Sequence, residues 1–368
     1  MTVAVVGAGL AGLSAAWEVN QAGVEVVVLD AGRQPGGMIV TERREGFIVE
    51  GGPDGFLATE PDIQELAREI GIGDRLVDQV ERGSTLWTGR GLEPLAEGKA
   101  AELLGIQANP NVGGFTTFAA GMAEVVEALV ACLAPRPRTT QGVTAIAPAT
   151  RGWRLSFTGG SALEAEAVIL AVPSWVAARL LAGLGVSGAR ALDTVLYAPS
   201  LTVSLAYRAD QVPRTLEGGG AGFVAASDSG GALRACTYTW RKYPKRAPEG
   251  FALLRAFVGS VDGDPASIAH AELAAILGIE GDPLWTRAFH WPRGLPRYPR
   301  GHAERVAAVR ERLARLAPLA IAGAGFDGAG VSACVKSGRE AAKRVLGRLA
   351  QRGDGSGGGL KMQSTVRE

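Results

Sequence analysis

The sequence has few of the residues that build metal sites and disulfide frameworks. It contains three cysteines and three histidines in 368 residues, and neither type shows the close spacing of zinc ligands or of a C-x-x-C motif. The cysteines, Cys132, Cys236 and Cys334, are widely separated and odd in number. This pattern argues against a disulfide framework and favours a reducing compartment. We therefore expect no metal ion in this protein.

Long apolar runs and an excess of charge are also missing. No apolar segment reaches the ~18 residues of a transmembrane helix, and 38 basic residues nearly balance 37 acidic residues. This balance leaves no overall field that would recruit nucleic acid or anionic lipid. The first predicted strand begins at residue 3, which leaves no room for a signal or transit peptide before it. We therefore expect a cytoplasmic protein that does not bind nucleic acid.

Glycine, in contrast, is abundant. The chain has 52 glycines, about twice the typical ~7% share, as expected where many tight turns and close approaches of backbone to ligand occur. A hydrophobic content of 47% over this length is sufficient for two domains, each with its own core.

The N-terminal segment carries the motif that indicates the ligand class. A short apolar run leads directly into Gly7, Gly9 and Gly12 in the spacing G-x-G-x-x-G, and a helical pattern follows at once. In a dinucleotide-binding fold the first glycine forms the tight turn, the second lets the backbone approach the pyrophosphate, and the third lets the helix pack on the strand. Leu10 and Ala11 begin the helix whose N-terminus would face the anion.

A second apolar strand, over residues 24–29, ends in Asp30. This is the distance expected for a carboxylate that hydrogen-bonds a ribose 2′-hydroxyl, and the negative charge argues against a 2′-phosphate. The next loop contains the further candidates for dinucleotide contact, which are Ala31, Arg33, Gly36, Gly37 and Met38.

Two motifs near the N-terminus resemble a known family. Residues 33–37 read R-x-x-G-G and resemble the flavin amine oxidase and protoporphyrinogen oxidase group, where the paired glycines let the backbone approach FAD. Residues 52–57 read G-P-D-G-F-L and closely resemble the G-P-D-S-F-L stretch of bacterial protoporphyrinogen oxidases. Residues 323–342 look like the flavin-closing segment of the same family. Over most of residues 1–350 the chain resembles HemY-type, oxygen-dependent protoporphyrinogen oxidases.

The resemblance implies an α/β fold with a discontinuous Rossmann-like FAD-binding domain and a mixed-sheet substrate domain. The expected division is an FAD-binding domain over 1–85, 113–174 and 291–350, a substrate domain over 175–290, a shortened remnant of a helical membrane-binding segment over 86–112, and a flexible tail over 351–368. Apolar periodicity predicts helices over residues 60–77, 115–134, 267–277, 302–316 and 330–349.

The resemblance also implies a reaction and a set of cofactor contacts. It implies six-electron oxidation of protoporphyrinogen IX, or of coproporphyrinogen, in three flavin-mediated steps with O2 as acceptor, within haem biosynthesis. The FAD contacts that it adds to those above are Gly51, Gly52, Pro53, Asp54, Val143, Gly323, Ala324, Gly330, Val331 and Ser332.

Four residues are candidates on the substrate side. Asp54 could receive a pyrrole proton, or it could serve as a turn or N-cap residue. Tyr243 matches an aromatic that sandwiches the macrocycle, or it is a core aromatic, and Val224 approximately matches an aliphatic partner. Arg82 lies two residues from the position of a propionate-binding arginine.

The resemblance fails over residues 90–112, where the family carries a long helical membrane-binding segment. We therefore expect weak or absent membrane association, with a raised KM and reduced turnover relative to full-length relatives. Expected partners are a small-molecule tetrapyrrole and O2, with transient contacts to other haem-pathway enzymes. Two alternatives remain, which are a flavin enzyme acting on another amine or polycyclic substrate, and a flavin-binding protein with little turnover.

Overall fold

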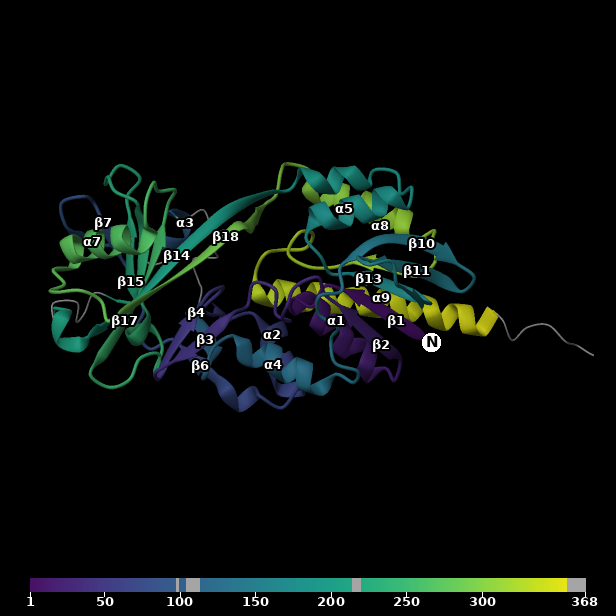
Figure 1. The fold of residues 1–368 in the computed structure, drawn as a ribbon, viewed down its shortest axis with the longest axis horizontal. Helices are drawn as coiled ribbons and strands as arrows, with labels where there is room; N and C mark the ends of the chain where they lie inside the picture. Colours follow the sequence, from purple (N-terminus) through teal and green to yellow (C-terminus); the bar gives the residue numbers. More distant parts are fainter. Residues whose placement is uncertain (97–98, 104–112, 214–219, 356–368) are drawn as a thin grey trace, which may run out of the picture.

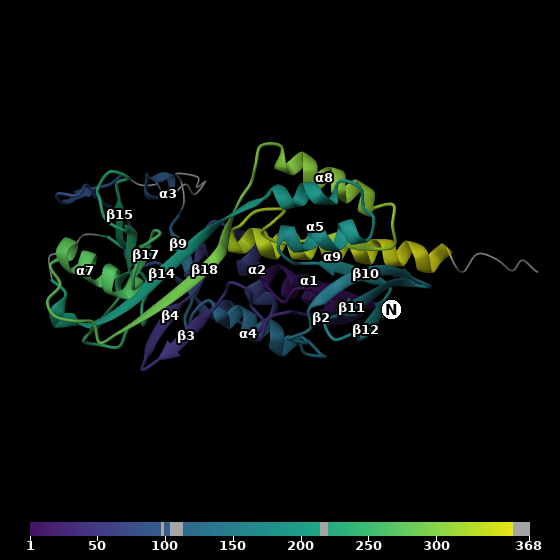
Figure 2. The ribbon, with the colours of Figure 1, turned by 45° about the horizontal axis from the view of Figure 1, so that its top comes forward.

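The protein forms two parts that are joined by a pair of long strands. The computed structural model describes residues 1–96, 99–103, 113–213 and 220–355. Strands β14 (Leu196–Arg208) and β18 (Trp285–Arg297) run side by side from one part to the other (Figures 1 and 2). The first residues, at the N label in Figure 1, and the last described residues belong to one part, and most of the other part comes from the middle of the sequence.

The first part is built on a parallel sheet of four strands in the order β19-β13-β1-β2. Their bounds are β1 (Thr2–Val6), β2 (Glu25–Leu29), β13 (Ala167–Leu170) and β19 (Leu319–Ile321). Val3 and Val5 join one apolar cluster, whereas Ala4 and Val6 join the cluster on the opposite face. The strands are apolar on both sides because both faces of the sheet are covered.

Helices cover one face of this sheet, and helices with a meander cover the other. The first face is covered by α1 (Leu10–Gln21), α2 (Pro61–Glu69), α4 (Ala123–Cys132) and α9 (Val331–Gly355). The second face is covered by α5 (Ser174–Gly183), α8 (His302–Leu313) and the antiparallel strands β10 (Val143–Ala149), β11 (Gly152–Phe157) and β12 (Ala162–Ala165). The sheet therefore lies at the centre of a three-layer domain (Figure 1).

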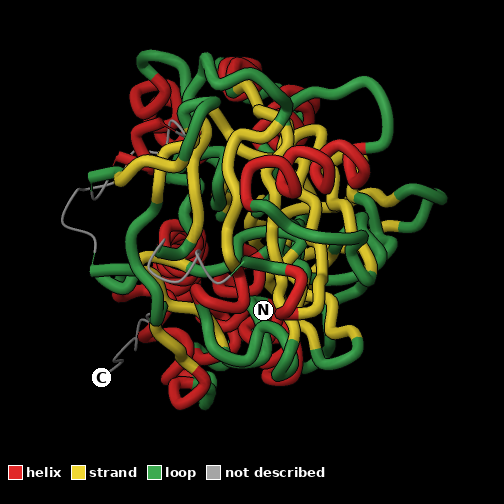
Figure 3. Tube along the Cα trace, turned by 90° about the vertical axis from the view of Figure 1, so that its left-hand side faces the viewer, coloured by secondary structure: helices red, strands yellow, loops and turns green. Residues whose placement is uncertain are grey.

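The second part contains a mixed sheet of seven strands in the order β18-β14-β17-β16-β15-β7-β8. Its shorter strands are β7 (Thr85–Trp87), β8 (Leu92–Pro94), β15 (Gly222–Ala225), β16 (Leu233–Tyr238) and β17 (Phe251–Val258). Only the β15–β7 pair is parallel. Helix α7 (Pro265–Leu277) packs on one face through Ala269, Leu273 and Leu277, and Figure 3 shows the strands side by side with a helix in front.

Two small sheets connect these parts. The hairpin of β3 (Thr41–Arg44) and β4 (Phe47–Glu50) packs on Leu253 and Phe289 of the larger sheet. The second small sheet has the order β5-β9-β6, with bounds β5 (Phe56–Leu57), β6 (Leu76–Asp78) and β9 (Phe115–Phe118). The remaining short elements are η1 (Gly73–Arg75), α3 (Lys99–Leu103), η2 (Ala189–Thr194), η3 (Ala209–Gln211) and α6 (Thr239–Lys242).

The predicted fold class is confirmed, because the nucleotide-binding sheet takes strands from distant parts of the sequence and the second sheet is mixed. The helix predicted over 115–134 is wrong in its first third. Residues 115–118 form β9, since Phe-Thr-Thr-Phe consists of aromatic and β-branched strand formers. Gly121, with φ of +106°, separates this strand from α4, which begins at Ala123.

Two predicted domain boundaries also need correction. Strands β7 and β8 add residues 85–94 to the seven-stranded sheet, so this stretch is not part of a separate remnant segment. Strand β18 continues across the boundary predicted between residues 290 and 291. Residues 97–98 and 104–112 of the predicted remnant lie outside the described residues, as do residues 356–368 of the predicted tail. Within the described ranges, no helix is both long and apolar enough to cross a membrane.

Candidate cofactor and substrate site

The turn between β1 and α1 contains three glycines of the motif. Packing requires glycine at two of these positions, and the third faces open space. A Cβ built on Gly7, whose φ is +105°, would lie 2.2 Å from the carbonyl oxygen of Ala171. A Cβ on Gly12 would lie 1.9 Å from the carbonyl oxygen of Gly7. A Cβ on Gly9 would meet nothing closer than 4.0 Å, so bare backbone there faces open space. This arrangement fits the close approach of a diphosphate.

The paired glycines predicted to assist this turn lie directly beside it. The Gly36 N–H donates to the carbonyl oxygen of Ala8 at 2.7 Å, and Gly9 forms an isolated bridge with Gly36. A Cβ on Gly37 would lie 3.2 Å from the Cα of Gly9. Helix α1 has Gly9 as its N-cap without a side-chain cap, so its first N–H groups are available to an anion.

Asp30 organises the same turn through backbone contacts that sequence reasoning missed. Its carboxylate accepts hydrogen bonds from the N–H of Ala8 at 2.5 Å and of Gly32 at 2.6 Å. Each carboxylate oxygen keeps further capacity to accept a ribose hydroxyl. The N–H of Gln141 donates to the Asp30 carbonyl oxygen at 2.7 Å, which brings the start of β10, with Val143, beside the loop that contains Ala31 and the exposed Arg33.

A polar chain joins the predicted flavin-closing segment to α8 and α9. The Gly323 N–H donates to the Ser337 Oγ at 2.8 Å, and the Ser337 hydroxyl donates to Asp327 at 2.6 Å. Arg310 of α8 also pairs with Asp327 at 2.6 Å. A Cβ on Gly323 would lie 3.5 Å from the Cβ of Ala11, so this segment meets the N-terminal motif although more than 300 residues separate them.

The other predicted FAD contacts in this segment differ in how exposed they are. Gly330 is exposed and Val331 begins α9, so both lie at a helix N-terminus. The Ala324 carbonyl oxygen accepts from the Tyr298 hydroxyl at 2.6 Å. Ser332 is buried, and its Oγ accepts from the Ile63 N–H at 3.2 Å, so its side chain supports α2.

Residues 51–54 join the N-terminal motif to the seven-stranded sheet. A Cβ on Gly52 would lie 1.7 Å from the Met38 carbonyl oxygen, and one on Gly51 would lie 2.6 Å from the Phe289 ring. Arg255 donates to the Gly52 carbonyl oxygen at 2.7 Å, and Trp291 donates to the Gly51 carbonyl oxygen at 2.6 Å. Pro53 continues this packed segment into Asp54. No sequence pattern marks Arg255 or Trp291 as neighbours of this segment.

Asp54 forms an ion pair with Lys242 that local sequence does not reveal. Lys242 Nζ lies 2.9 Å from Asp54 Oδ2, and the two side chains are 10% and 20% exposed. Burial alone would raise the pKa of Asp54, but the charges of Lys242 and Arg255 outweigh it and lower the pKa below its usual value. Asp54 is therefore a carboxylate at neutral pH, the form that can accept a proton, but a weaker base than an unpaired one.

Tyr243 and Val224 lie inside the protein in this conformation. Tyr243 is 1% exposed, and a Cβ on Gly55 would lie 2.3 Å from its hydroxyl oxygen. Burial raises the pKa of Tyr243, so the phenol stays neutral. Val224 is buried in β15 opposite Leu86 of β7. Direct contact of either side chain with a substrate therefore stays a prediction.

Buried charges beneath this site carry unsatisfied donors. Arg246 donates to the Thr117 hydroxyl at 2.8 Å and lies 3.9 Å from Glu50, whose pKa burial raises. Within the described part of the chain, Arg246 Nε and Nη1, Arg255 Nε and Tyr243 Oη have no hydrogen-bond partner. Buried polar atoms are nearly always paired in proteins. The open glycine cradle and these donors therefore fit a polar ligand such as a flavin dinucleotide.

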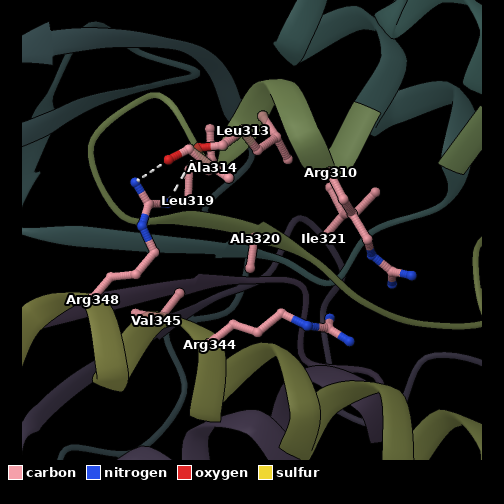
Figure 4. A pocket seen from close by; sticks show the side chains of 9 residues that line it. All are labelled: Arg310, Leu313, Ala314, Leu319, Ala320, Ile321, Arg344, Val345 and Arg348. Carbon is pink, nitrogen blue, oxygen red and sulfur yellow. Dashed lines mark hydrogen bonds between the residues drawn. The ribbon is translucent and has the colours of Figure 1, made fainter. Parts of the chain in front are cut away.

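A cavity of about 240 Å³ lies elsewhere, between α8, β19 and α9. Figure 4 shows three arginines at its edge. Arg348 donates to the carbonyl oxygens of Leu313 and Ala314, and Arg344 pairs with Glu340 in its own helix. None of the predicted site residues lines this cavity. Arg348 therefore ties α9 to the end of α8, and we assign the cavity no ligand.

The three cysteines do not form a reactive site. Burial raises the pKa of Cys334, the cysteine closest to the flavin-closing motif, to about 12. Its thiol is therefore protonated at neutral pH and is a poor nucleophile. Among the described residues there is no group of three or more His, Cys, Asp or Glu side chains that could hold a metal ion.

Two protein-family models match this chain. The model for flavin containing amine oxidoreductases matches residues 84–346, and the model for NAD(P)-binding Rossmann-like domains matches residues 5–70. The chain belongs to the flavin-containing amine oxidoreductase family. It is therefore a flavin-dependent oxidoreductase, and the match to the Rossmann-like model covers the glycine cradle described above.

Relatives within this family match nearly the whole chain. The coproporphyrinogen III oxidase of Bacillus subtilis (strain 168) is 25% identical, with 94% of this chain and 97% of the relative covered. The coproporphyrinogen III oxidase of Staphylococcus aureus (strain NCTC 8325 / PS 47) is 22% identical, with 95% and 99% covered. The first alignment spans 464 positions, more than the length of this chain, so that relative contains segments that are absent here.

A solved structure shows the same fold. It belongs to a protein of Exiguobacterium sp. 255-15 that is provisionally named a protoporphyrinogen oxidase, and it superposes with a TM-score of 0.81 at 22% identity. The superposition covers 95% of this chain and 99% of the other. Both the discontinuous nucleotide-binding domain and the mixed-sheet domain therefore have a counterpart in a known structure.

Proposed function

We propose that this protein is an FAD-dependent oxidase that converts coproporphyrinogen III, or protoporphyrinogen IX, into the corresponding porphyrin with O2 as electron acceptor. The observation that carries this proposal is the match over nearly the full length of two relatives that are both named coproporphyrinogen III oxidase. The glycine cradle supports a dinucleotide form of the flavin, because it is the anion-binding part of a Rossmann-like fold.

In this proposal the candidate residues have three roles. The backbone around Gly9, Gly36 and Gly37 approaches the diphosphate, and Asp30 accepts a ribose hydroxyl. Bound FAD supplies the electron-accepting ring. Asp54, kept ionised by Lys242, faces the pyrrole N–H groups that lose protons as electrons leave. Over three rounds a porphyrinogen loses six electrons and six protons, and three O2 molecules become three molecules of hydrogen peroxide.

The direct test measures turnover together with the ratio of peroxide to porphyrin formed. Purified protein is incubated with coproporphyrinogen III, with protoporphyrinogen IX and with a panel of amines, while porphyrin fluorescence and peroxide are followed. We expect three molecules of peroxide for each porphyrin formed, and none of either from the amines. Because porphyrinogens oxidise slowly in air, a protein-free sample sets the background. Peroxide from an amine without porphyrin from either porphyrinogen would refute the proposal.

Asp30→Ala is expected to weaken FAD binding by about 1.5–3 kcal/mol, because it removes a charge-assisted hydrogen bond to the ribose. The change also removes the acceptor of two backbone N–H groups, so flavin affinity and unfolding of the flavin-free protein are both measured. Asp30→Asn keeps one acceptor oxygen, so its affinity for FAD should lie between those of the wild type and of Asp30→Ala. Exposed Asp193 provides the charge-matched control, Asp193→Ala. Unchanged flavin affinity in Asp30→Ala would remove Asp30 from this role.

A further inference from the structure

Two consecutive carbonyl groups near Asp54 are held by side chains of the seven-stranded sheet. The Trp291 indole N–H of β18 donates to the Gly51 carbonyl oxygen at 2.6 Å, and Arg255 of β17 donates to the Gly52 carbonyl oxygen at 2.7 Å. Asp54 follows two residues after Gly52. The sheet therefore holds the backbone that leads directly into the proposed proton acceptor.

The same two glycines are also fixed from the cofactor side. The Gly51 N–H donates to the Val40 carbonyl oxygen at 2.7 Å, and a Cβ on Gly52 would lie 1.7 Å from the carbonyl oxygen of Met38, which follows the paired glycines of the cradle. On the sheet side, a Cβ on Gly51 would lie 2.6 Å from the Phe289 ring. This short segment therefore sets the separation between the cradle and the sheet.

Arg255 also brings a charge to Asp54. It is 6% exposed, and its Nε has no hydrogen-bond partner among the described residues. The titratable side chains that act on Asp54 are Lys242, Arg246, Arg255 and Tyr243. In contrast, Arg82, the arginine that the sequence predicted for the substrate side, is exposed beside Gly114. Arg255 therefore combines a contact to the backbone before Asp54 with a positive charge.

We propose that Trp291 and Arg255 are positioning residues that fix Asp54 relative to the glycine cradle, and that Arg255 also supplies part of the positive charge that keeps Asp54 ionised. A displacement of about 1 Å can cost on the order of a hundredfold in rate, so a proton acceptor gains from a segment tied to both parts of the molecule. This inference rests on the proposed function, because it takes Asp54 as the proton acceptor.

Trp291→Phe tests position without a change of charge. We expect flavin content and the KM for coproporphyrinogen III to stay close to the wild type, and kcat to fall about tenfold. Trp285→Phe is the matched control, because Trp285 lies on the same strand and its indole N–H has no partner among the described residues. The control makes the same change of side chain without removing a hydrogen bond, so kcat should stay at the wild-type value.

Arg255→Met and Arg255→Lys test the charge. In Arg255→Met less positive charge opposes the burial of Asp54, so its pKa rises and the fall of kcat/KM on the acid side moves to higher pH. Arg255→Lys keeps the charge and should keep the wild-type pH profile, although kcat falls because the planar fork is lost. Arg287→Met is the control, because Arg287 and Arg255 both stand opposite Ser204 in the sheet, and Arg287 pairs with Glu42.

A second measurement needs no turnover. In flavin-loaded protein with isotope-labelled aspartate, the Asp54 carboxyl signal is identified by its absence in Asp54→Asn and is followed by NMR as the pH changes. It should titrate at higher pH in Arg255→Met than in the wild type or in Arg287→Met. Circular dichroism checks that each variant is folded.

The outcomes separate the two roles from the proposed function. Equal kcat in Trp291→Phe and Trp285→Phe would refute the positioning role. An Asp54 titration in Arg255→Met that matches the wild type would refute the electrostatic role. If the wild type oxidises neither porphyrinogen, the proposed function fails and the positioning role fails with it, whereas the titration of Asp54 still decides the electrostatic role of Arg255.

Discussion

Lys242→Met is expected to lower the free energy of unfolding by about 3 kcal/mol at pH 7.5, because removing one partner of a buried ion pair leaves the other charge uncompensated. In the wild type, Asp54 accepts a hydrogen bond from Lys242 Nζ at 2.9 Å, and the pKa of Asp54 is lowered. Its contribution to stability is therefore present above the unfolded pKa of about 3.9 and is lost as the pH falls through the lower folded value.

The variant weakens this dependence. Without Lys242, burial of Asp54 is opposed only by the charges of Arg255 and Arg246, so the pKa of Asp54 rises from its wild-type value and its ionised form stabilises the folded protein less. The difference between wild type and variant should therefore be smaller at pH 4.5 than at pH 7.5, measured by urea unfolding. Asp54→Asn combined with Lys242→Met should recover most of the loss, because the carboxylate that loses its partner in Lys242→Met is then absent.

Lys343→Met is the control for removing a lysine from a pair. Lys343 is exposed and lies 3.7 Å from Glu18, and such surface pairs contribute about 0–1 kcal/mol. If Lys242→Met loses no more free energy of unfolding than Lys343→Met does, or if its loss does not change with pH, Asp54 and Lys242 are not coupled in solution.

Gly12→Ala should abolish flavin retention and destabilise the protein by about 3 kcal/mol, at the upper end of overpacking effects. The added Cβ would lie 1.9 Å from the Gly7 carbonyl oxygen and 3.2 Å from the Cβ of Ala171. Both contacts are to packed groups, so α1 must move away from β1. The helix N-terminus then loses its position against the diphosphate. Flavin content is measured from the visible absorbance of purified protein, and stability from urea unfolding.

Gly183→Ala and Gly347→Ala provide controls for the same chemical change. Both glycines are helical, and a Cβ on either meets nothing within 4 Å. Alanine is favoured over glycine in a helix by about 1 kcal/mol, so these variants should keep their flavin and gain a little stability. Full flavin content in Gly12→Ala would mean that the β1–α1 turn does not need its third glycine for cofactor binding.

On the cofactor side, several predicted residues lie together in one turn, because their contacts are local or follow a known motif. Gly7, Gly9, Gly12 and Asp30 lie within 30 residues, and the turn that they form is fixed by strand–turn–helix packing. The resemblance to a flavin family is confirmed by the match over residues 84–346. The roles of the predicted site residues, in contrast, still await experiments.

The substrate side could not be predicted to the same degree. Tyr243 and Val224 are in the expected region but are buried, because the strands beside them pack against the segment that contains Gly55 and against β7. Phe115 was assigned to a helix, since its apolar spacing fits the helical pattern of the residues that follow. Gly121 and the pairing of β9 with β5 and β6 place it in a strand instead.

By itself, the sequence determined the Rossmann-like turn, the class of cofactor and the family, because short segments with strict backbone requirements encode them. Only the tertiary structure decided the charge environment of the proposed reaction. Asp54 and Lys242 are 188 residues apart in the chain, and Arg255 and Gly52 are 203 apart. No local pattern links such residues. Burial and charge then set the protonation of Asp54, and both depend on how the two sheets pack together.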